Sequence, residues 1–309
     1  MYEKIPTAGI SREEWLKLRK TGIGGSDAGA VCRLDPYRSI TGVFKDKTCG
    51  STETKDNESM RQGRDLEDYV AARFSEATGL KTRRSNFMYR SLEYPYMVAD
   101  VDRLVTGMDA GLECKTASAY SADKWKNGNI PLHYLVQCYH YMAVTGKKVW
   151  YIAAVILGKD FVYHRLEWDD ALISQLRETE GRFWHENIIK GIMPEPDGSK
   201  ACDEVLAQYF HTAKKGSFIE LSGFDEKLDR RAEITGQIAA LQQEQAKIEQ
   251  ELKKYMGENE TASSGRYKVS WSNVETVRLE TKRIRMEQPQ IYEDYSKVSV
   301  SRRLQIKAA

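Results

Sequence analysis

The segment DRLVTGMDAGLECK, which runs from Asp102 to Lys115, determines how we interpret the rest of the chain. Residues 96–106 are rich in aromatic and β-branched side chains, residues 107–111 favour a turn, and a second extended run follows, so the segment predicts a β-hairpin. Side chains alternate between the two faces of a strand, so Glu113 and Lys115 project to one side. The hairpin brings Asp102 beside them. We therefore expect two carboxylates and one lysine to converge on one face.

This combination of side chains suits the hydrolysis of a phosphodiester bond. Carboxylate oxygens bind Mg²⁺ or Mn²⁺, and such an ion takes water and substrate phosphate oxygens as further ligands. The bound ion lowers the pKa of a coordinated water, and a nearby lysine orients or deprotonates that water and neutralises charge on the phosphorus centre. The pattern D-x10-E-x-K is short, however, and a surface hairpin with an ordinary Glu–Lys pair also satisfies it. Further motifs are needed to distinguish a nuclease site from an ordinary surface hairpin.

Three further motifs narrow the choice: GGSD at residues 24–27, GRDLE at residues 63–67 and QCYHY at residues 137–141. Together with Asp102 and the ECK motif, they resemble the PD-(D/E)xK nuclease superfamily. Within it they are most similar to the YqaJ-type viral recombinases, relatives of phage lambda exonuclease. The resemblance spans roughly residues 15–155. It implies an α/β fold with a restriction-endonuclease-like core, in which helices flank a mixed central sheet.

The resemblance also assigns roles within the hairpin. Asp102 and Glu113 match the superfamily's metal-binding acids, so Mg²⁺ is the expected cofactor and Mn²⁺ the alternative. The backbone carbonyl of Cys114 matches a further ligand, and Lys115 matches the residue that orients or deprotonates the water. Asp100 is a departure, because relatives often carry a neutral residue there. It is either the true ligand or a second acid that supports a different metal arrangement.

Residues 60–79 are the most strongly helical part of the chain, and the polar stretch before them, residues 49–59, is expected to be a loop. Glu67 lies in line with the apolar stripe of this helix, where a carboxylate needs a cation or a metal as partner. By resemblance, Glu67 is the helix-borne acid of the site and holds metal directly or through water. The alternative is a glutamate at the edge of the stripe, ion-paired with Arg64 or Arg73.

A glycine-rich break at residues 21–25 separates two expected helices, one beginning at Ser11 and the other capped by Ser26. Glycines before a helix N-terminus let backbone N–H groups approach an anion. In the lambda-exonuclease-like family, an arginine and a serine at this spacing hold the 5′-phosphate of a DNA end. Arg19 and Ser26 match these positions, with Lys20 as the alternative to Arg19. An ordinary turn between two helices would explain the same glycines.

Residues 131–146 predict another helix, in which His133, Gln137 and Tyr141 form a row at i, i+4 and i+8. The pattern Gln-x-x-x-Tyr resembles a motif that RecB-like nucleases place against the metal site. Gln137 is then expected to position a phosphate or a base, and Tyr141 to hydrogen-bond Lys115 or a phosphate. The alternative is a half-buried polar row. A separate apolar stripe is expected to face the core: Leu132, Leu135, Val136, Tyr139 and Met142.

We expect residues 1–200 to form the nuclease domain and residues 201–309 a C-terminal extension. A long helix is expected over residues 224–256, where apolar residues recur near heptad spacing and Gln245 interrupts the repeat. A coiled-coil hairpin, a strut against the nuclease core and an oligomer contact all fit this helix. A basic α/β tail follows, with a short strand expected at residues 302–307. Its Lys and Arg residues fit either phosphate contacts or a solvated surface.

Composition restricts the class of protein further. A hydrophobic content of 41% and a charged content of 30% are those of a soluble globular protein, and a net charge of +2 predicts no particular partner. No run approaches the roughly 20 apolar residues of a membrane span, and the opening MYEKIP lacks the apolar core of a signal peptide. The five cysteines show no C-x-x-C spacing, which argues against a disulfide framework, a zinc site or a four-cysteine iron–sulfur cluster. We expect a reducing cytosol.

These observations lead to one interpretation and two alternatives. We interpret the chain as a metal-dependent DNA exonuclease that digests one strand of linear duplex DNA from 5′ to 3′, which leaves 3′ single strands for phage-type recombination in a bacterial host's cytosol. The resemblance implies duplex DNA ends as substrate, a single-strand annealing recombinase as partner and a homo-oligomer, by family a trimer. One alternative is a restriction-like or structure-specific endonuclease. The other is a non-catalytic DNA-binding or assembly module.

Overall fold

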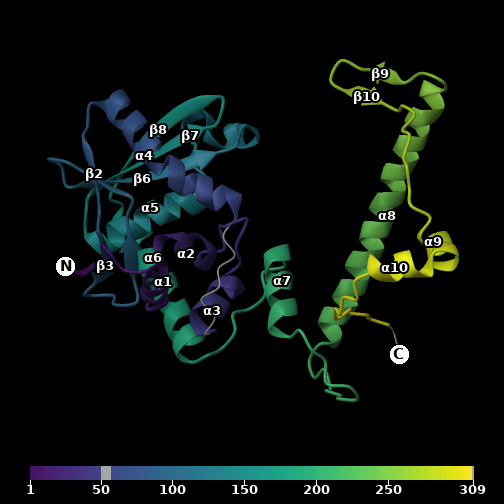
Figure 1. The fold of residues 1–309 in the computed structure, drawn as a ribbon, viewed down its shortest axis with the longest axis horizontal. Coiled ribbons are helices and arrows are strands. Elements are labelled where there is room, and N and C mark those ends of the chain that lie inside the picture. The colour runs from purple at the N-terminus through teal and green to yellow at the C-terminus, as the bar shows by residue number, and fades with distance from the viewer. Residues whose placement is uncertain (50–56, 308–309) are drawn as a thin grey trace. The chain divides into compact units, whose positions relative to one another are not determined.

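The computed structural model describes residues 1–49 and 57–307 of the chain, which divide into two compact units, Met1–His211 and Thr212–Ala309 (Figure 1). Most of the loop expected at residues 49–59 lies outside the described residues.

The first unit contains two β-sheets with helices around them. In chain order its elements are β1 (Tyr2–Pro6), α1 (Arg12–Lys20), α2 (Gly25–Val31), α3 (Ile40–Thr48), α4 (Glu58–Thr78), β2 (Thr82–Arg84), β3 (Phe87–Ser91), β4 (Val98–Asp100), β5 (Arg103–Val105), β6 (Ala110–Ala117), the 3₁₀ segment η1 (Ala119–Gly128), α5 (Leu132–Thr145), β7 (Val149–Ile156), β8 (Asp160–Glu167), α6 (Asp170–Arg182), the π-helical segment η2 (Phe183–Ile189) and α7 (Lys200–Tyr209).

A five-stranded mixed sheet forms the centre of this unit, with the order β2-β5-β6-β7-β8. The pair β6 and β7 is parallel, with Glu113 opposite Ile152, whereas the other pairs are antiparallel. Helix α4 covers one face, where Phe74 packs with Leu112, and α5 covers the other, where Met142 packs with Trp150 (Figure 1). The predicted fold class, a mixed sheet flanked by helices, is confirmed.

The hairpin that carries the ECK motif differs in detail from the prediction. Residues 96–106 are not one strand, because β4 belongs to a separate three-stranded sheet, β1-β3-β4, and β5 to the central sheet. The turn is also shorter than expected, since β6 begins at Ala110. Asp102 lies between the two sheets, where the chain leaves β4 and enters β5. Its position therefore depends on both sheets.

Two predictions about helices were wrong. Gly24, and not Ser26, is the N-cap of α2, and the carboxylate of Asp27 accepts a hydrogen bond from the Gly24 N–H (3.0 Å). In α5 the expected apolar stripe is not the most buried face: Leu132 is 56% exposed, whereas Gln137 is buried. The reason is tertiary, because α2 packs against the polar row of α5.

Helices α2 and α5 approach each other closely because two glycines face the contact. A Cβ atom at Gly25 would lie 2.4 Å from the ring of Tyr141, and one at Gly29 would lie 2.8 Å from the Cβ of His133. Such distances are too short for any larger residue without movement of a helix. The glycines of α2 therefore fix the separation between this helix and the row His133, Gln137 and Tyr141.

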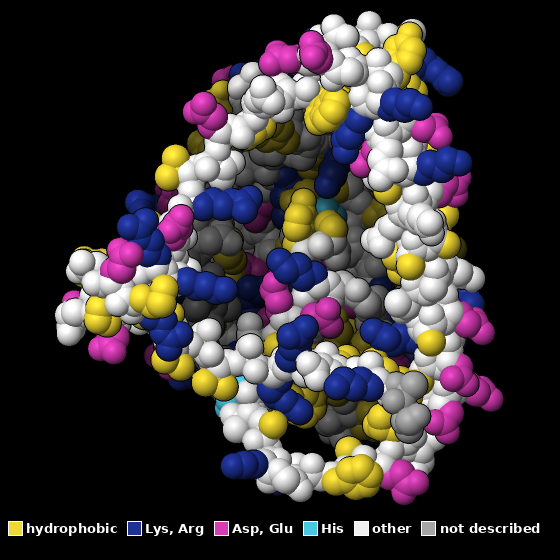
Figure 2. Space-filling view, turned by 90° about the vertical axis from the view of Figure 1, so that its right-hand side faces the viewer, with side chains coloured by type: hydrophobic (Ala, Val, Ile, Leu, Met, Phe, Trp, Pro, Cys, Tyr) yellow, Lys and Arg dark blue, Asp and Glu magenta, His cyan; other side chains and the backbone are white. Residues whose placement is uncertain are grey.

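The second unit contains α8 (Asp225–Met256), the antiparallel hairpin β9 (Thr261–Ser263) and β10 (Lys268–Ser270), α9 (Thr281–Glu287) and α10 (Pro289–Asp294). The predicted long helix is confirmed, but the strand expected at residues 302–307 is absent from the described residues. Apolar residues at the heptad-like positions of α8, such as Leu241 and Ile248, are exposed. In Figure 2 apolar side chains are visible at the surface among charged ones. In the described part of the chain, no helix is long and apolar enough to cross a membrane.

Candidate active site

Strand β6 presents Glu113 and Lys115 towards α5, and the chain before β5 places Asp102 beside them. The Lys115 Nζ lies 2.7 Å from Glu113 Oε1, and Asp102 Oδ2 accepts a hydrogen bond from the Cys114 N–H (2.8 Å). Gln137 Nε2 donates to the same Glu113 oxygen (2.7 Å) and to the Tyr141 hydroxyl (2.8 Å). The structure thus brings together the predicted acid pair, lysine and glutamine. Tyr141 bonds Gln137, a partner that the sequence did not indicate.

The ionised forms of the two carboxylates, Asp102 and Glu113, are electrostatically unfavourable in this group. Burial and the neighbouring Glu113 raise the pKa of Asp102 well above its usual value, and burial raises the pKa of Glu113 as well. Burial alone would lower the pKa of Lys115, but the two carboxylates raise it instead. A divalent cation between the acids would relieve their repulsion, because it supplies the positive charge that one lysine does not.

The donor atoms of the acid pair fit such a cation. Glu113 Oε2 is buried and has no hydrogen-bond partner among the described residues, so it is available as a ligand. Asp102 offers a second carboxylate beside it, whose Oδ2 already accepts from the Cys114 N–H. Among the described residues, no three His, Cys, Asp or Glu side chains are arranged as a complete metal site. Mg²⁺ does not require one, because it is commonly held by one or two carboxylates together with water and substrate phosphates.

Glu67 reaches the acid pair from α4, but an arginine already holds it. Arg103 of β5 forms an ion pair with Glu67, and it also donates to Asp68 Oδ1 (2.5 Å) and to the Asp102 carbonyl (2.7 Å). This partner is neither of the two arginines that we considered from the sequence. The sequence contained one signal for this partner. Arg103 stands in a short apolar strand, where a cation needs acidic partners.

Asp100 is directed towards α1. Its Oδ2 accepts a hydrogen bond from Trp15 Nε1 (2.8 Å), and burial raises the pKa of this carboxyl group. The guanidinium of Arg19 lies over the Trp15 ring, 5.0 Å from its centroid. Trp15 therefore links the strand that precedes Asp102 to the glycine-rich break.

At that break, Arg19 and Ser26 are in contact, as the phosphate-binding hypothesis requires. Arg19 Nη2 donates to Ser26 Oγ (2.6 Å). Next to them the carboxylate of Asp27 is buried among three cations: Lys47 Nζ at 2.6 Å, Arg19 at 3.9 Å and the guanidinium of Arg38, which forms an ion pair with it. Burial opposes ionisation of Asp27, but these cations lower its pKa well below the usual value. Arg38 also forms an ion pair with Asp46 (2.5 Å), so three cations face two acids and one positive charge is left over.

The sequence did not indicate most of this cation cluster. Arg38 and Lys47 are 11 and 20 residues from Asp27, and neither lies in a motif that we recognised. Lys20, the alternative to Arg19, donates to the Cys49 carbonyl (2.8 Å). Asp27 was visible within the GGSD motif, but only the structure shows that it holds the cluster together.

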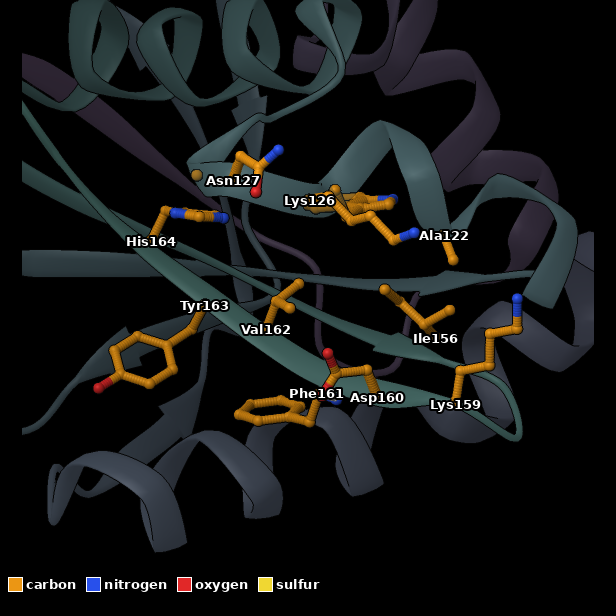
Figure 3. A pocket seen from close by; sticks show the side chains of 12 residues that line it. Ala122, Lys126, Asn127, Ile156, Lys159, Asp160, Phe161, Val162, Tyr163 and His164 are labelled. Atoms are coloured by element: carbon orange, nitrogen blue, oxygen red, sulfur yellow. Dashed lines mark hydrogen bonds between the residues drawn. The ribbon is translucent and has the colours of Figure 1, made fainter. Parts of the chain in front are cut away.

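A cleft of about 880 Å³ contains the acid pair, and its lining includes Trp15, Glu67, Asp102, Glu113 and Lys115. A second hollow of about 640 Å³ lies between η1 and β8 (Figure 3). Asp160 is the single acidic residue in the lining of that hollow, so it offers no acid pair for phosphodiester chemistry. The first cleft is therefore the candidate active site.

Comparison with known proteins adds two findings. Residues 14–148 match the model of the YqaJ-like viral recombinase domain. The YqaJ protein of Bacillus subtilis (strain 168) is 35% identical over 303 residues, which cover 96% of this chain and 95% of that protein.

Among solved structures, the alkaline exonuclease LHK-Exo of Laribacter hongkongensis is similar to this chain. Its complex with dAMP has 20% identity and a TM-score of 0.51, and a second crystal structure has 19% identity and a TM-score of 0.50. Both alignments cover 65% of this chain and all of LHK-Exo. At this identity the likeness establishes a shared fold, which agrees with the fold predicted from the motifs.

Proposed function

This chain belongs to the YqaJ-like viral recombinase family, and from that premise we propose that it is a metal-dependent DNA exonuclease. It digests one strand of linear duplex DNA from 5′ to 3′ and leaves 3′ single strands for homologous recombination. The observation that carries the proposal is the acid pair Asp102 and Glu113 beside Lys115 in a cleft, with Arg19 and Ser26 in contact at the glycine-rich break.

Each residue of the cleft has a role in this reaction. A divalent ion held by Asp102, Glu113 and the Cys114 carbonyl, with Glu67 close by, would supply positive charge and lower the pKa of a coordinated water. Gln137 orients Glu113 by bonding one carboxylate oxygen, which leaves the other free. Lys115 orients or deprotonates the attacking water and stabilises charge that develops on the phosphate.

The positive cluster explains why digestion would begin at an end. A terminal 5′-phosphate carries more negative charge than an internal phosphate, and Arg19 and Ser26 offer it a guanidinium and a hydroxyl. LHK-Exo was crystallised with dAMP, a nucleoside monophosphate, which is the product expected when an exonuclease removes one nucleotide at a time. We extend this to the present chain as part of the proposal.

The family also suggests the setting of the reaction. We propose that the enzyme acts in a bacterial host's cytosol, that a single-strand annealing recombinase takes up the exposed 3′ strand, and that the chain works as a homo-oligomer, by family a trimer. Size-exclusion chromatography with light scattering tests the oligomer, and a pull-down with a single-strand annealing protein tests the partner.

The activity is tested with linear duplex DNA carrying either a 5′-phosphate or a 5′-hydroxyl, and with a covalently closed circle, in Mg²⁺. We expect loss of the linear substrates only, faster with the 5′-phosphate. The variant Lys115→Ala should be inactive, whereas Lys126→Ala, on the exposed surface of η1, should behave as wild type. Cutting of the circle would instead indicate an endonuclease. Absence of cleavage in both Mg²⁺ and Mn²⁺ would indicate a non-catalytic binding module.

A further inference from the structure

Four aromatic side chains follow one another along the wall of the active-site cleft. The ring of Tyr37 meets that of His133 edge-on at 5.9 Å between centroids, and the His133 ring lies 4.0 Å from that of Tyr134. Tyr134 in turn stacks on Trp125 at 5.8 Å, with 27° between the planes. All four line the cleft that contains Glu113 and Lys115. We call Tyr37, His133, Tyr134 and Trp125 the aromatic row.

Tyr37 differs from the rest of the row because its ring is open to the cleft. Trp125 is buried, and Tyr134 lies between Trp125 and the ammonium group of Lys115, which is 4.6 Å from its ring centroid. Tyr37 is 70% exposed, and Lys124 Nζ is 5.9 Å from its ring centroid. An exposed aromatic ring beside a lysine is the combination that proteins use to hold an unpaired base and its phosphate.

The backbone at Tyr37 is fixed next to the cation cluster. The N–H groups of Tyr37 and Arg38 donate to Asp35 Oδ1 at 2.7 Å and 3.2 Å, which holds the turn between α2 and α3. The side chain of Arg38 bonds Asp27 in the cluster that contains Arg19. Tyr37 is therefore the neighbour in sequence of Arg38, which shares the carboxylate of Asp27 with Arg19.

His133 provides a second, independent indication of a ligand. Its Nε2 atom is buried and has no hydrogen-bond partner among the described residues. Burial lowers the pKa of His133, so the ring is neutral at physiological pH. A neutral, unsatisfied ring nitrogen in a cleft is a group that the polar edge of a bound base can satisfy.

We propose that Tyr37 is the stacking site for the nucleobase of the 5′-terminal nucleotide, whose phosphate Arg19 and Ser26 hold. The inference rests on the proposed function and adds a subsite to it. The ring accepts any base, because every base has a π face, so the subsite senses that a terminal base is present and not which base it is. The phosphate is then held at the start of α2, and the base by the turn that follows α2.

The test removes the base from the DNA and the ring from the protein. Binding is measured by fluorescence anisotropy in Ca²⁺, which is used to prevent cleavage, with 5′-phosphorylated duplexes whose terminal nucleotide is either natural or abasic. For the wild-type protein we expect loss of the base to weaken binding roughly 5- to 150-fold, the range of base–aromatic stacking. In Tyr37→Ala both duplexes should bind equally, at the affinity of the wild-type protein for the abasic duplex. Tyr37→Phe should retain the difference.

A matched control uses Tyr120, a fully exposed tyrosine of η1 that does not line the cleft. Tyr120→Ala should keep the full effect of removing the base. As a second readout, 2-aminopurine at the 5′ end should be quenched on binding to the wild-type protein and to Tyr120→Ala, but not on binding to Tyr37→Ala. Melting temperatures of the variants verify that each is folded.

The outcomes separate the subsite from the proposed function. If the base contributes as much in Tyr37→Ala as in wild type, the stacking site is wrong and the exonuclease assignment stands. If the wild-type protein neither prefers a 5′-phosphate nor cleaves linear DNA, the proposed function itself is wrong, and the subsite is overturned with it.

Discussion

Asp27 and Glu113 are both buried carboxylates, 1% and 2% exposed, yet their pKa values are shifted in opposite directions. Burial disfavours the ionised form of each. Asp27 is surrounded by three cations, which lower its pKa far enough to reverse that effect. Burial raises the pKa of Glu113, and the single Lys115 ammonium beside it does not reverse that effect.

Neighbouring charges therefore decide whether the effect of burial is overcome: three cations reverse it at Asp27, whereas one ammonium group does not reverse it at Glu113. On the proposed function, the excess of cations around Asp27 attracts the terminal phosphate. The acids around Glu113 attract the divalent cation. A nucleic acid end that carries both a phosphate and a bond to be cut matches this arrangement.

The largest expected effect is on cleavage, in the variant Glu113→Gln. We expect a loss of about 10⁴-fold in the rate of strand cleavage, because the amide cannot bind the metal as the carboxylate does. The free energy of unfolding at neutral pH should stay level or rise, because a carboxylate with a raised pKa destabilises the folded state when it is ionised. Single-turnover kinetics and urea unfolding measure the two effects. A variant that is both inactive and less stable would show that ionised Glu113 does not destabilise the folded state.

The corresponding change at the other region, Asp27→Asn, should have the opposite effect on stability. It leaves Arg19, Arg38 and Lys47 close together without their shared acid. We expect a loss of about 3–5 kcal/mol in the free energy of unfolding, as for other broken buried ion pairs. Urea unfolding at pH 7 measures it. Unchanged stability would mean that solvent already screens these cations.

The stability of these two variants, relative to wild type, should also depend on pH. Asp27 has a lowered pKa in the folded state, so its stabilising effect is complete above its ordinary pKa of 3.8 and is lost as the pH falls below that value. Glu113 has a raised pKa, so its destabilising effect begins to shrink as the pH falls through that raised value and is gone below its ordinary pKa of 4.5. Relative to wild type, both variants should therefore converge on zero difference in acid, from opposite signs. Unfolding series at decreasing pH show whether they do.

A smaller effect is expected when Glu113 is kept and its orienting partner is removed. Gln137→Leu takes away the donor to Glu113 Oε1 and should slow cleavage about 10- to 100-fold, corresponding to 1–3 kcal/mol for a buried acceptor left with one partner fewer. Leu132→Ala, on an exposed position of the same helix, serves as the control. Equal cleavage rates for the two variants would show that Gln137 does not contribute to the reaction.

The smallest effect is expected outside both regions. The ion pair between Arg182 and Glu178 is exposed on α6, so Arg182→Ala should change the free energy of unfolding by no more than about 0.5 kcal/mol and leave cleavage unchanged. A larger change would show that exposed charges matter here as much as the buried ones.

Local patterns in the sequence were sufficient for the framework of the fold and for the centre of the site. Alternation along β6 predicted that Glu113 and Lys115 share a face, and they are in contact. The capping box at Ser11 and the glycine after α4 predicted the start of one helix and the end of another. These features depend on residues within a few positions of one another, so one sequence contains the information.

What the sequence did not indicate depends on long-range contacts. The partner of Glu67 is Arg103, 36 residues away, and two partners of Asp27 are Arg38, before α3, and Lys47, on α3. The buried face of α5 was misjudged because apolar residues were assumed to face inwards, whereas the glycines of α2 bury the polar row. The strand expected at residues 302–307 rested on local composition, and the described structure provides no neighbouring strand to pair with it.

The close contact of α2 with α5 has a consequence for the size of the product. Ser26 lies on α2 and Gln137 on α5, so Gly25 and Gly29 set the distance from the group that grips the DNA end to the group that orients the catalytic acid. On the proposed function, the fixed spacing of the two helices sets the distance between the held 5′ end and the bond that is cut. The length of the released fragment is then the same whatever the DNA sequence.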